Sequence, residues 1–382
     1  FVFLFNSCSG SEAIQHFFYL CDLESKVWVW LNANEIFKMN YNNTLNNNYS
    51  ALCMPSIVNK NYLDLGNYEK LFYLINKKTD IFFIIRDPIS IIKTALNHID
   101  NLYAWNNFQQ NSLYKKITYC NYSFESLFPK ILYAYSNSYK VNIKDIDKCL
   151  SNYEFYFTLN KRLNILKNIS KNIVCINFEE LKFKNIFNTL NKLSMKFKFN
   201  KPSEKYRFVF ESKVNTFEGL LHLPVEINIF NLQVFITTPY LLTLEKSNIS
   251  KFKNITKIFF ENDFVLDNII ITCDIKYNID FFLKNNKWIE FKDYIVAYIK
   301  ALKKYINYTK TNLISEEDIL NYLKKNKQLY FKFRTHINEN ITYIKDNHPE
   351  YIKTWKYYQE FEKMCEELDG GSEIKQIENN SN

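Results

Sequence analysis

The stretch from Ile81 to Thr94 constrains the fold more than any other part of the sequence. Five consecutive apolar residues, 81–85, are typical of a central strand of a parallel sheet, which is covered on both faces. Pro88 suits the first turn of a helix, where its missing N–H costs no hydrogen bond. The pattern predicts a strand followed at once by a helix. Arg86 would then lie at the carboxyl edge of the sheet, where open α/β sheets bind ligands.

Arg86 is distinctive because arginine is scarce in this chain. Only four of the 49 basic residues are arginine, and the rest are lysine. Lysine, asparagine, isoleucine, tyrosine and phenylalanine are all abundant, which indicates AT-rich coding more than selection for charge. In such a composition, an arginine at a strand end favours a role for its planar, bidentate guanidinium. A phosphate is the group that such a fork binds well.

The order Arg86-Asp87-Pro88, with a hydroxyl eight residues after the arginine at Thr94, carries a family resemblance. It resembles the 3′-phosphate-binding segment of nucleotide-dependent sulfotransferases, in which a serine stands where this chain has threonine. A guanidinium at the strand end and a hydroxyl two turns into the helix would hold one phosphate from two sides. The alternative is an arginine that closes the sheet and pairs with a neighbouring carboxylate.

The N-terminal segment predicts the phosphate-binding unit of a P-loop fold. Residues 1–5 are expected to form a strand, 6–11 a loop and 13–20 an apolar helix. In P-loop folds this arrangement aims the backbone N–H groups and partial positive charge of the helix N-terminus at phosphate. A dinucleotide-binding Rossmann fold would instead have a Gly-x-Gly-x-x-Gly after the first strand, and this chain has none there.

The loop itself resembles the sulfotransferase loop that binds the 5′-phosphosulfate. Ser9, Gly10 and Ser11 match the family pattern in kind. Cys8 replaces the family's basic residue, and Glu12 replaces its second threonine. The basic residue normally neutralises charge on the bridging oxygen during transfer, which a cysteine cannot do. Either another lysine supplies this charge, or the donor is different, or the site is inactive.

Two residues are candidates for the base that accepts the proton of an acceptor hydroxyl. In carbohydrate sulfotransferases this base is the glutamate of a Lys-Glu pair after the second strand. A strand is expected here at 27–31, and Glu35 is the residue that matches that glutamate. A glutamate suits this role if burial raises its pKa, although a solvated turn is the commoner explanation. His98, which closes the helix begun at Pro88, is the alternative base.

A third block supports a sulfotransferase-like order. Helical spacing at 155–169 precedes a strand at 172–178, the acidic pair Glu179-Glu180 and an amphipathic helix at 186–193. The acidic pair is structural in that family and is expected to be structural here. The predicted fold class is therefore α/β, with a parallel sheet of the P-loop, sulfotransferase-like type. This nucleotide-binding domain is expected at 1–205 and, because it begins inside a strand, to lack upstream sequence.

The remainder of the chain predicts a smaller domain of strands followed by helices, at 206–368. Apolar β-branched runs at 225–243 and 264–274 predict the strands, and helical periodicity dominates from Trp288 onward. A capping signal, Ser-x-x-Asp, begins at residue 315. The polar tail at 369–382 is expected to be disordered.

The segment Trp355–Met364 carries a second resemblance. It resembles the end of a bacterial family of unknown function that is associated with capsule and surface-glycan genes and labelled as sugar transferases. Its aromatic residues would stack on sugar rings if they were exposed. At helical spacing, however, an aromatic stripe more often belongs to a core.

Composition argues against several other sites and partners. The eight cysteines show neither Cys-x-x-Cys spacing nor a disulfide pattern, so we expect no metal site and a reducing, cytoplasmic location, including the inner face of the membrane. No apolar run reaches about 18 residues, so no transmembrane segment is expected. The net charge of +9 comes from dispersed lysines, which does not favour a nucleic-acid partner. The oligomeric state is open.

The resemblances imply a transferase that moves a sulfuryl or similar phosphoryl-type group from a nucleotide donor to a sugar hydroxyl of a cell-surface polysaccharide. The implied donor is 3′-phosphoadenosine-5′-phosphosulfate, a co-substrate and not a tightly bound cofactor. Its implied ligands are Ser9, Gly10, Ser11, Arg86 and Thr94.

Two alternatives remain open. One is a glycosyltransferase of capsule or surface-glycan synthesis, many of which bind a metal through Asp-x-Asp. Asp145-Ile146-Asp147 has lysines on both sides and is better interpreted as a charge-paired turn. The other alternative is a non-catalytic glycan-binding or assembly protein, which the presence of Cys8 and Glu12 would permit.

Overall fold

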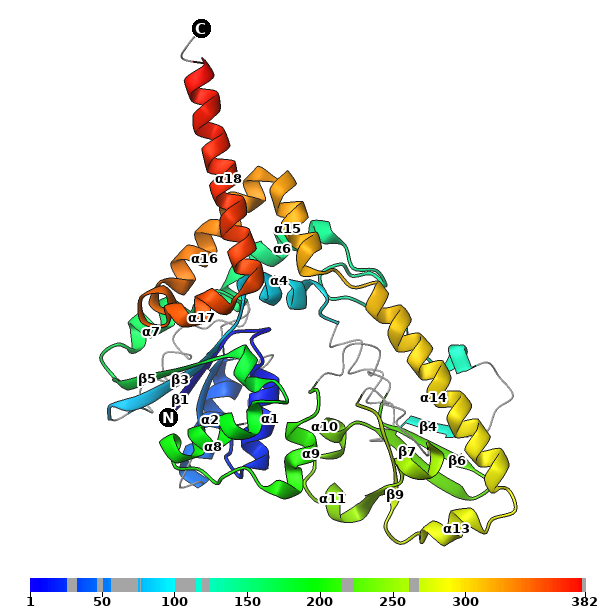
Figure 1. The fold of residues 1–382 in the computed structure, drawn as a ribbon. Coiled ribbons are helices and arrows are strands. Elements are labelled where there is room, and N and C mark those ends of the chain that lie inside the picture. The colour runs from blue at the N-terminus through cyan, green and yellow to red at the C-terminus, as the bar shows by residue number, and fades with distance from the viewer. Residues whose placement is uncertain are drawn as a thin grey trace. The chain divides into compact units, whose positions relative to one another are not determined.

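The computed structural model of the chain describes residues 1–25, 33–46, 51–55, 75, 77–99, 115–118, 124–128, 130–214, 223–260 and 268–379. Over these residues the fold is mixed α/β, with one four-stranded and one five-stranded sheet (Figure 1). Two compact units alternate along the chain. Unit 1 comprises Phe1–Asn97, Asn142–Pro202 and Ile314–Asn382, and unit 2 comprises His98–Val141 and Ser203–Leu313.

The sheet of unit 1 is parallel throughout and has the strand order β2-β1-β3-β5. Its strands are β1 (Val2–Phe5), β2 (Leu52–Pro55), β3 (Thr79–Ile85) and β5 (Ser170–Asn177). The chain leaves β1 toward β2 on one side, whereas β3 is followed by β5 on the other side. The connections therefore diverge between β1 and β3. This is a topological switch point, outside whose carboxyl ends open α/β sheets bind ligands.

The central strands are apolar because helices cover both faces of the sheet. On one face, Phe3 of β1 and Phe82 of β3 lie 5.2 Å apart, and Phe18 of α1 (Ser11–Leu20) contacts both rings. On the other face, Phe83 of β3 packs edge-on against Tyr343 of α16 (Lys327–Asn347), at 6.0 Å. Residues far apart in the sequence thus enclose one sheet.

The C-terminal helices complete unit 1. Helix α4 (Pro88–Leu96) packs against α15 (Glu316–Lys325) and α18 (Lys356–Asn379), and α16 packs against α7 (Leu159–Leu166) (Figure 1). Residues 314–368 belong to the same unit as the first sheet. The division into domains at 1–205 and 206–368 stays a prediction. Helix α18 also runs through residues 369–379, where a disordered tail was expected.

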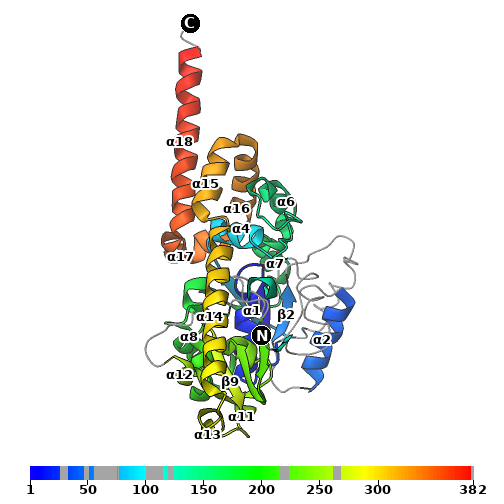
Figure 2. The ribbon, with the colours of Figure 1, turned by 90° about the vertical axis from the view of Figure 1, so that its right-hand side faces the viewer.

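Unit 2 is built on a mostly antiparallel sheet with the order β4-β6-β7-β9-β8, in which only the β4–β6 pair is parallel. The strands are β4 (Lys115–Thr118), β6 (Val225–Ile229), β7 (Leu232–Thr237), β8 (Phe252–Asn254) and β9 (Ile270–Asp274). The 24-residue helix α14 (Trp288–Thr311) runs beside this sheet (Figures 1 and 2). It buries Phe291, Ile295 and Tyr298 in the same core as the strands. The strands predicted at 225–243 and 264–274 are confirmed at β6, β7 and β9, whereas residues 239–242 are helical and 261–267 lie outside the described residues.

Shorter helices connect these elements. They are, in unit 1, α6 (Ile146–Ser151), α8 (Ile186–Phe197), α17 (Pro349–Thr354) and the 3-10 turns η2 (Ile143–Asp145), η3 (Tyr153–Phe155) and η4 (Phe178–Leu181); and in unit 2, α9 (Arg207–Phe210), α10 (Pro239–Leu242), α11 (Asn248–Lys251), α12 (Thr256–Phe259), α13 (Ile279–Leu283), η1 (Phe124–Leu127) and η5 (Glu204–Tyr206).

The strand and helix predicted around Pro88 are confirmed as β3 and α4. Helix α2 (Ala33–Asn46) and strand β2 lie in an Asn-rich part of the sequence. Helix α2 packs beside the edge strand β2, where the Asn40 amide bonds to the backbone of Cys53 (Figure 2). The strand expected at 27–31 lies outside the described residues.

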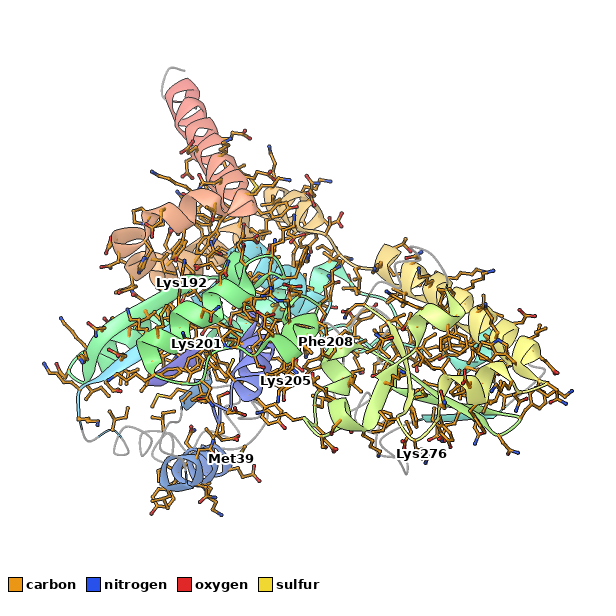
Figure 3. All side chains as sticks on the ribbon, turned by 60° about the horizontal axis from the view of Figure 1, so that its bottom comes forward. Met39, Lys192, Lys201, Lys205, Phe208 and Lys276 are labelled. Carbon is orange, nitrogen blue, oxygen red and sulfur yellow. The ribbon has the colours of Figure 1, made fainter. Side chains whose placement is uncertain are left out.

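None of the described helices is long and apolar enough to cross a membrane. The positive charge is distributed over the surface of both units. Figure 3 labels examples on each, Lys192 and Lys201 in unit 1 and Lys205 and Lys276 in unit 2, all of them exposed.

Candidate functional site

Arg86 follows β3 directly, and its guanidinium lies at the switch point of the unit 1 sheet. Its Nη1 donates a 2.7 Å hydrogen bond to the carbonyl oxygen of Cys8, in the loop after β1. The ring of Phe178, the first residue after β5, lies 4.3 Å from the guanidinium carbon. Three neighbouring strands therefore each place one of these residues at the same edge, because parallel strands end on the same side of a sheet.

The charge of Arg86 is not neutralised by an ion pair with any described residue. The Cys8 carbonyl takes one of its five N–H donors, and no other hydrogen bond joins it to the described part of the chain. Burial lowers the pKa of Arg86, and Cys8, Glu316, Asp87 and Glu179 oppose this shift. The guanidinium stays charged at neutral pH. A partly buried cation with open N–H donors is suited to an anionic ligand.

Gly10 allows the loop after β1 to pass close to Phe178. Its φ is +93°, in the left-handed region, and a Cβ at this position would lie 2.8 Å from the Phe178 ring. Gly10 is also the N-cap of α1 and contributes no side-chain cap. No capping side chain therefore competes with a ligand for the N–H groups of the first turn. A role for Gly10 in a phosphate-binding loop stays a prediction.

The other loop residues differ in what they offer. Ser11 is partly exposed, and its hydroxyl makes no hydrogen bond within the described residues. Ser9 is buried, and its Oγ donates to the carbonyl oxygen of Asn6 at 2.6 Å, so it closes the loop. Burial raises the pKa of the Cys8 thiol to about 12, against the effect of Arg86. Cys8 is therefore uncharged at neutral pH and supplies no charge to a ligand.

Arg162 is a second arginine at this edge, and the motif analysis does not single it out. It is buried, and its Nη2 donates to Asn6 Oδ1 at 2.5 Å and to the Phe5 carbonyl at 3.2 Å, while its Nη1 donates to the Met54 carbonyl at 2.8 Å. It thus ties the end of β1 to the end of β2. The scarcity of arginine is the sequence signal that points to it.

Asp87 has a structural role that the Arg-Asp-Pro motif alone does not show. Its Oδ1 accepts from the backbone N–H of Ile89 at 2.9 Å, as the N-cap of α4. Its Oδ2 accepts from Tyr357 and Tyr358, at 3.0 and 3.1 Å, in the first turn of α18. Burial raises the pKa of Asp87, and these backbone donors oppose the rise. One carboxylate therefore caps two helices and is not a free ligand.

The motif predicts that the Thr94 hydroxyl binds a phosphate, but this hydroxyl forms a hydrogen bond within its own helix. Its Oγ1 donates to the Ser90 carbonyl oxygen at 2.9 Å, within α4. One turn closer to Arg86, the Ser90 hydroxyl donates to Glu316 Oε1 at 2.9 Å, and Lys93 Nζ lies 3.0 Å from the same oxygen. The polar side chains on this part of α4 are thus Ser90 and Lys93, neither of which the sequence analysis identified.

Among the described residues, Arg86 makes no hydrogen bond or ion pair with either candidate base. Glu35 is exposed in the first turn of α2, next to the edge strand β2. The carboxylates whose charge raises the pKa of Arg86 are Glu316, Asp87 and Glu179. His98 follows the C-terminal end of α4, opposite to the Arg86 end, and belongs to unit 2, where its carbonyl accepts from the Ala134 N–H. A base role for either residue stays a prediction.

The remaining motifs have structural partners. Asp145 pairs with Lys148 at 2.8 Å and Asp147 with Lys332 at 3.2 Å, so the expected charge pairing is confirmed, although these residues lie in η2 and α6 and not in a turn. Glu180 accepts from the Asn177 N–H in a capping box, which agrees with a structural acidic pair. Among the described residues, no group of histidine, cysteine and acidic side chains has the arrangement of a metal site.

The aromatic stripe of α18 and the residue before it belong to the core. Trp355, Tyr358 and Phe361 are buried, and the Phe361 ring lies 5.2 Å from that of Phe333 in α16. The capping signal at residue 315 is also confirmed, because Ser315 and Asp318 bond to each other's backbone N–H groups. Neither feature presents an open surface for a sugar.

A family described as protein of unknown function (DUF2972) matches residues 175–368. The chain belongs to this family. In this DUF2972 protein the matched segment begins in β5 and ends in α18, so it includes Phe178 and Glu316 but not Arg86 or the loop after β1. The expectation of a family of unknown function for the C-terminal half is confirmed at that level. No curated protein and no solved structure matches the chain.

Proposed function

We propose that this DUF2972 protein is a transferase that binds the phosphate of a nucleotide donor at the carboxyl ends of β1 and β3. The observation that carries the proposal is the Arg86 guanidinium, held by the Cys8 carbonyl at the switch point with no ion pair among the described residues. Gly10 supports it, because it leaves the first N–H groups of α1 without a side-chain cap in the loop whose Cys8 carbonyl holds Arg86.

The proposed reaction moves a sulfuryl group, or a similar phosphoryl-type group, to a sugar hydroxyl of a cell-surface polysaccharide. The bond from the group to the donor's bridging oxygen breaks, a bond to the acceptor oxygen forms, and the hydroxyl proton passes to a base. Such transfers depend mainly on positioning and on stabilising negative charge. Arg86 supplies the positive charge that stabilises it at this site. The neutral Cys8 thiol does not provide the positive charge that the family's basic residue gives to the bridging oxygen of the donor. 3′-Phosphoadenosine-5′-phosphosulfate is therefore the donor that the resemblance alone implies.

Binding of 3′,5′-adenosine bisphosphate, followed by isothermal titration calorimetry, tests the proposal. The wild-type protein should bind it, and Arg86→Gln should weaken binding by at least about tenfold, the effect of losing a charge-assisted contact. Arg207→Gln is the matched control, because Arg207 is an exposed arginine paired with Glu204 and Glu211. It should bind as the wild type does.

Other ligands separate the remaining functions. Binding of a nucleotide sugar, but not of the bisphosphate, would favour the glycosyltransferase and reject the proposed donor. Binding of the bisphosphate without transfer to any acceptor would favour a non-catalytic glycan-assembly protein. Equal affinity of the wild type and Arg86→Gln would reject the site itself.

A further inference from the structure

A cluster that no motif of the sequence indicates lies at α4, the helix that begins two residues after Arg86, and consists of Ser90, Lys93 and Glu316. One carboxylate oxygen, Glu316 Oε1, accepts from the Ser90 hydroxyl at 2.9 Å and lies 3.0 Å from Lys93 Nζ. Ser90 and Lys93 are three residues apart on α4 and therefore share one face of the helix. Glu316 is the first residue of α15, and its side chain is 12% exposed.

The Glu316 carboxylate has the surroundings that a phosphate oxygen would have. A hydroxyl and an ammonium group meet on one of its oxygens, and these are donors that bind phosphate strongly. Among the carboxylates whose charge raises the pKa of Arg86, Glu316 has the largest effect. An anion at the position of the Glu316 carboxylate would thus contact Ser90 and Lys93 and interact electrostatically with Arg86.

Lys93 also supplies the positive charge that the loop after β1 lacks. Cys8 stands where the resembling family has a basic residue, and its thiol is neutral because burial raises its pKa. Thr94, the expected hydroxyl, donates to a backbone carbonyl within its own helix. Ser90 and Lys93 provide a hydroxyl and a positive charge near the same strand end.

We infer that Ser90 and Lys93, together with Arg86, are the phosphate ligands of this site, and that Glu316 is an internal anion which the phosphate displaces. The inference rests on the proposed nucleotide-binding function. The Lys93 side chain is 33% exposed, so its ion pair with Glu316 contributes modestly to stability. A phosphate carries more charge and more acceptor oxygens than a carboxylate, and it therefore competes for the same donors.

Glu317 offers a matched control on the same helix turn. It carries the same charge as its neighbour, but its Oε1 accepts from the Tyr357 hydroxyl at 3.0 Å, and Lys356 lies 3.8 Å from it. Among the described residues it forms no hydrogen bond or ion pair with α4, and its side chain is about half exposed. Removing its charge tests for a general electrostatic effect of the α15 N-terminus without touching Ser90 or Lys93.

The experiment measures the affinity of the full chain for 3′,5′-adenosine bisphosphate and for inorganic pyrophosphate by isothermal titration calorimetry. Glu316→Gln, which keeps the size and the acceptor for Ser90, should bind about fivefold more tightly, the ratio expected when a partly exposed ion pair no longer competes. Glu317→Gln should stay within about twofold of the wild type. Lys93→Gln should bind about fivefold more weakly. Circular dichroism establishes that each variant is folded.

The outcomes distinguish this inference from the proposed function. If the wild type binds and Arg86→Gln does not, but Glu316→Gln binds no more tightly, the displacement is overturned and the proposed function stands. Should Lys93→Gln bind as the wild type does, Lys93 is not a ligand, whatever the behaviour of Glu316→Gln. If Arg86→Gln binds like the wild type, or if no variant binds either probe, the proposed function fails and the inference with it.

Discussion

Gly10 occupies a position that only glycine fits, for two independent reasons. Its φ of +93° is unfavourable for other residues, and a Cβ would lie 2.8 Å from Phe178, the ring that also contacts Arg86. Gly10→Ala should therefore lower the free energy of unfolding by about 1–3 kcal/mol, measured by urea denaturation. It should also weaken binding of the bisphosphate, because Phe178 and Arg86 would have to move.

Lys198 provides the control for this substitution. It also has a left-handed φ, of 61°, but it is exposed and already carries a Cβ. Lys198→Ala should change the free energy of unfolding by less than about 0.5 kcal/mol. An equally small change for Gly10→Ala would mean that Phe178 does not lie against the loop.

The Cys8 thiol leads to a prediction about pH. Burial raises its pKa to about 12, so it should react slowly with iodoacetamide at pH 8 and gain reactivity only in strongly alkaline solution. Because the folded pKa lies above the ordinary value, this thiol stabilises the fold fully below about pH 8.5 and less as the pH rises toward 12. Mass spectrometry of the Cys8 peptide follows the reaction, with urea-unfolded protein as the control. A half-point near pH 8.5 in the folded protein contradicts this environment.

At the scale of elements, one carboxylate joins two helices. Asp87 accepts from the first turns of both α4 and α18, and it is buried. Asn at this position has a single acceptor oxygen and leaves backbone N–H groups of one helix without a partner. Asp87→Asn should therefore cost about 2 kcal/mol in urea denaturation. Hydrogen exchange at Tyr357 and Tyr358 should accelerate.

The exposed cap of α15 is the comparison for Asp87→Asn. Asp318 accepts from the Ser315 N–H at 2.9 Å, but on the surface, where water replaces a lost bond. Asp318→Asn should cost about 0.5–1 kcal/mol. If Asp87→Asn costs no more than this, the carboxylate does not hold α4 and α18 together.

The elements that the sequence predicts well are those whose pattern is local. The apolar run of β3, Pro88 at the start of α4 and the cap at Ser315 each depend on neighbours within a few residues. Strand β2 has only four residues beside an Asn-rich segment, so composition conceals it. The same limit applies to the site. Arg86 is readable from its motif, whereas Ser90 and Glu316 meet across 226 residues of sequence, which no local pattern records.

At the scale of the whole molecule, the first sheet depends on the last helices of the chain. Tyr343 of α16 packs on Phe83 of β3, and α15 and α18 pack against α4. The linear sequence hides this arrangement because the whole of residues 203–313 lies in the other unit. These contacts form because the second face of the sheet must be buried. The local periodicity of the sequence does not show which helix covers that face.

Truncation tests this dependence. A chain that ends at Leu313 lacks α15 to α18 and leaves the apolar face of β3 and one side of α4 uncovered, so unit 1 should not fold cooperatively. A chain that ends at Asp369 keeps the Arg334–Asp369 ion pair, at 2.7 Å, and the buried part of α18, and should unfold like the full chain. Circular dichroism in urea measures both. If the chain that ends at Leu313 keeps the full cooperative transition, these helices are not part of the core of unit 1.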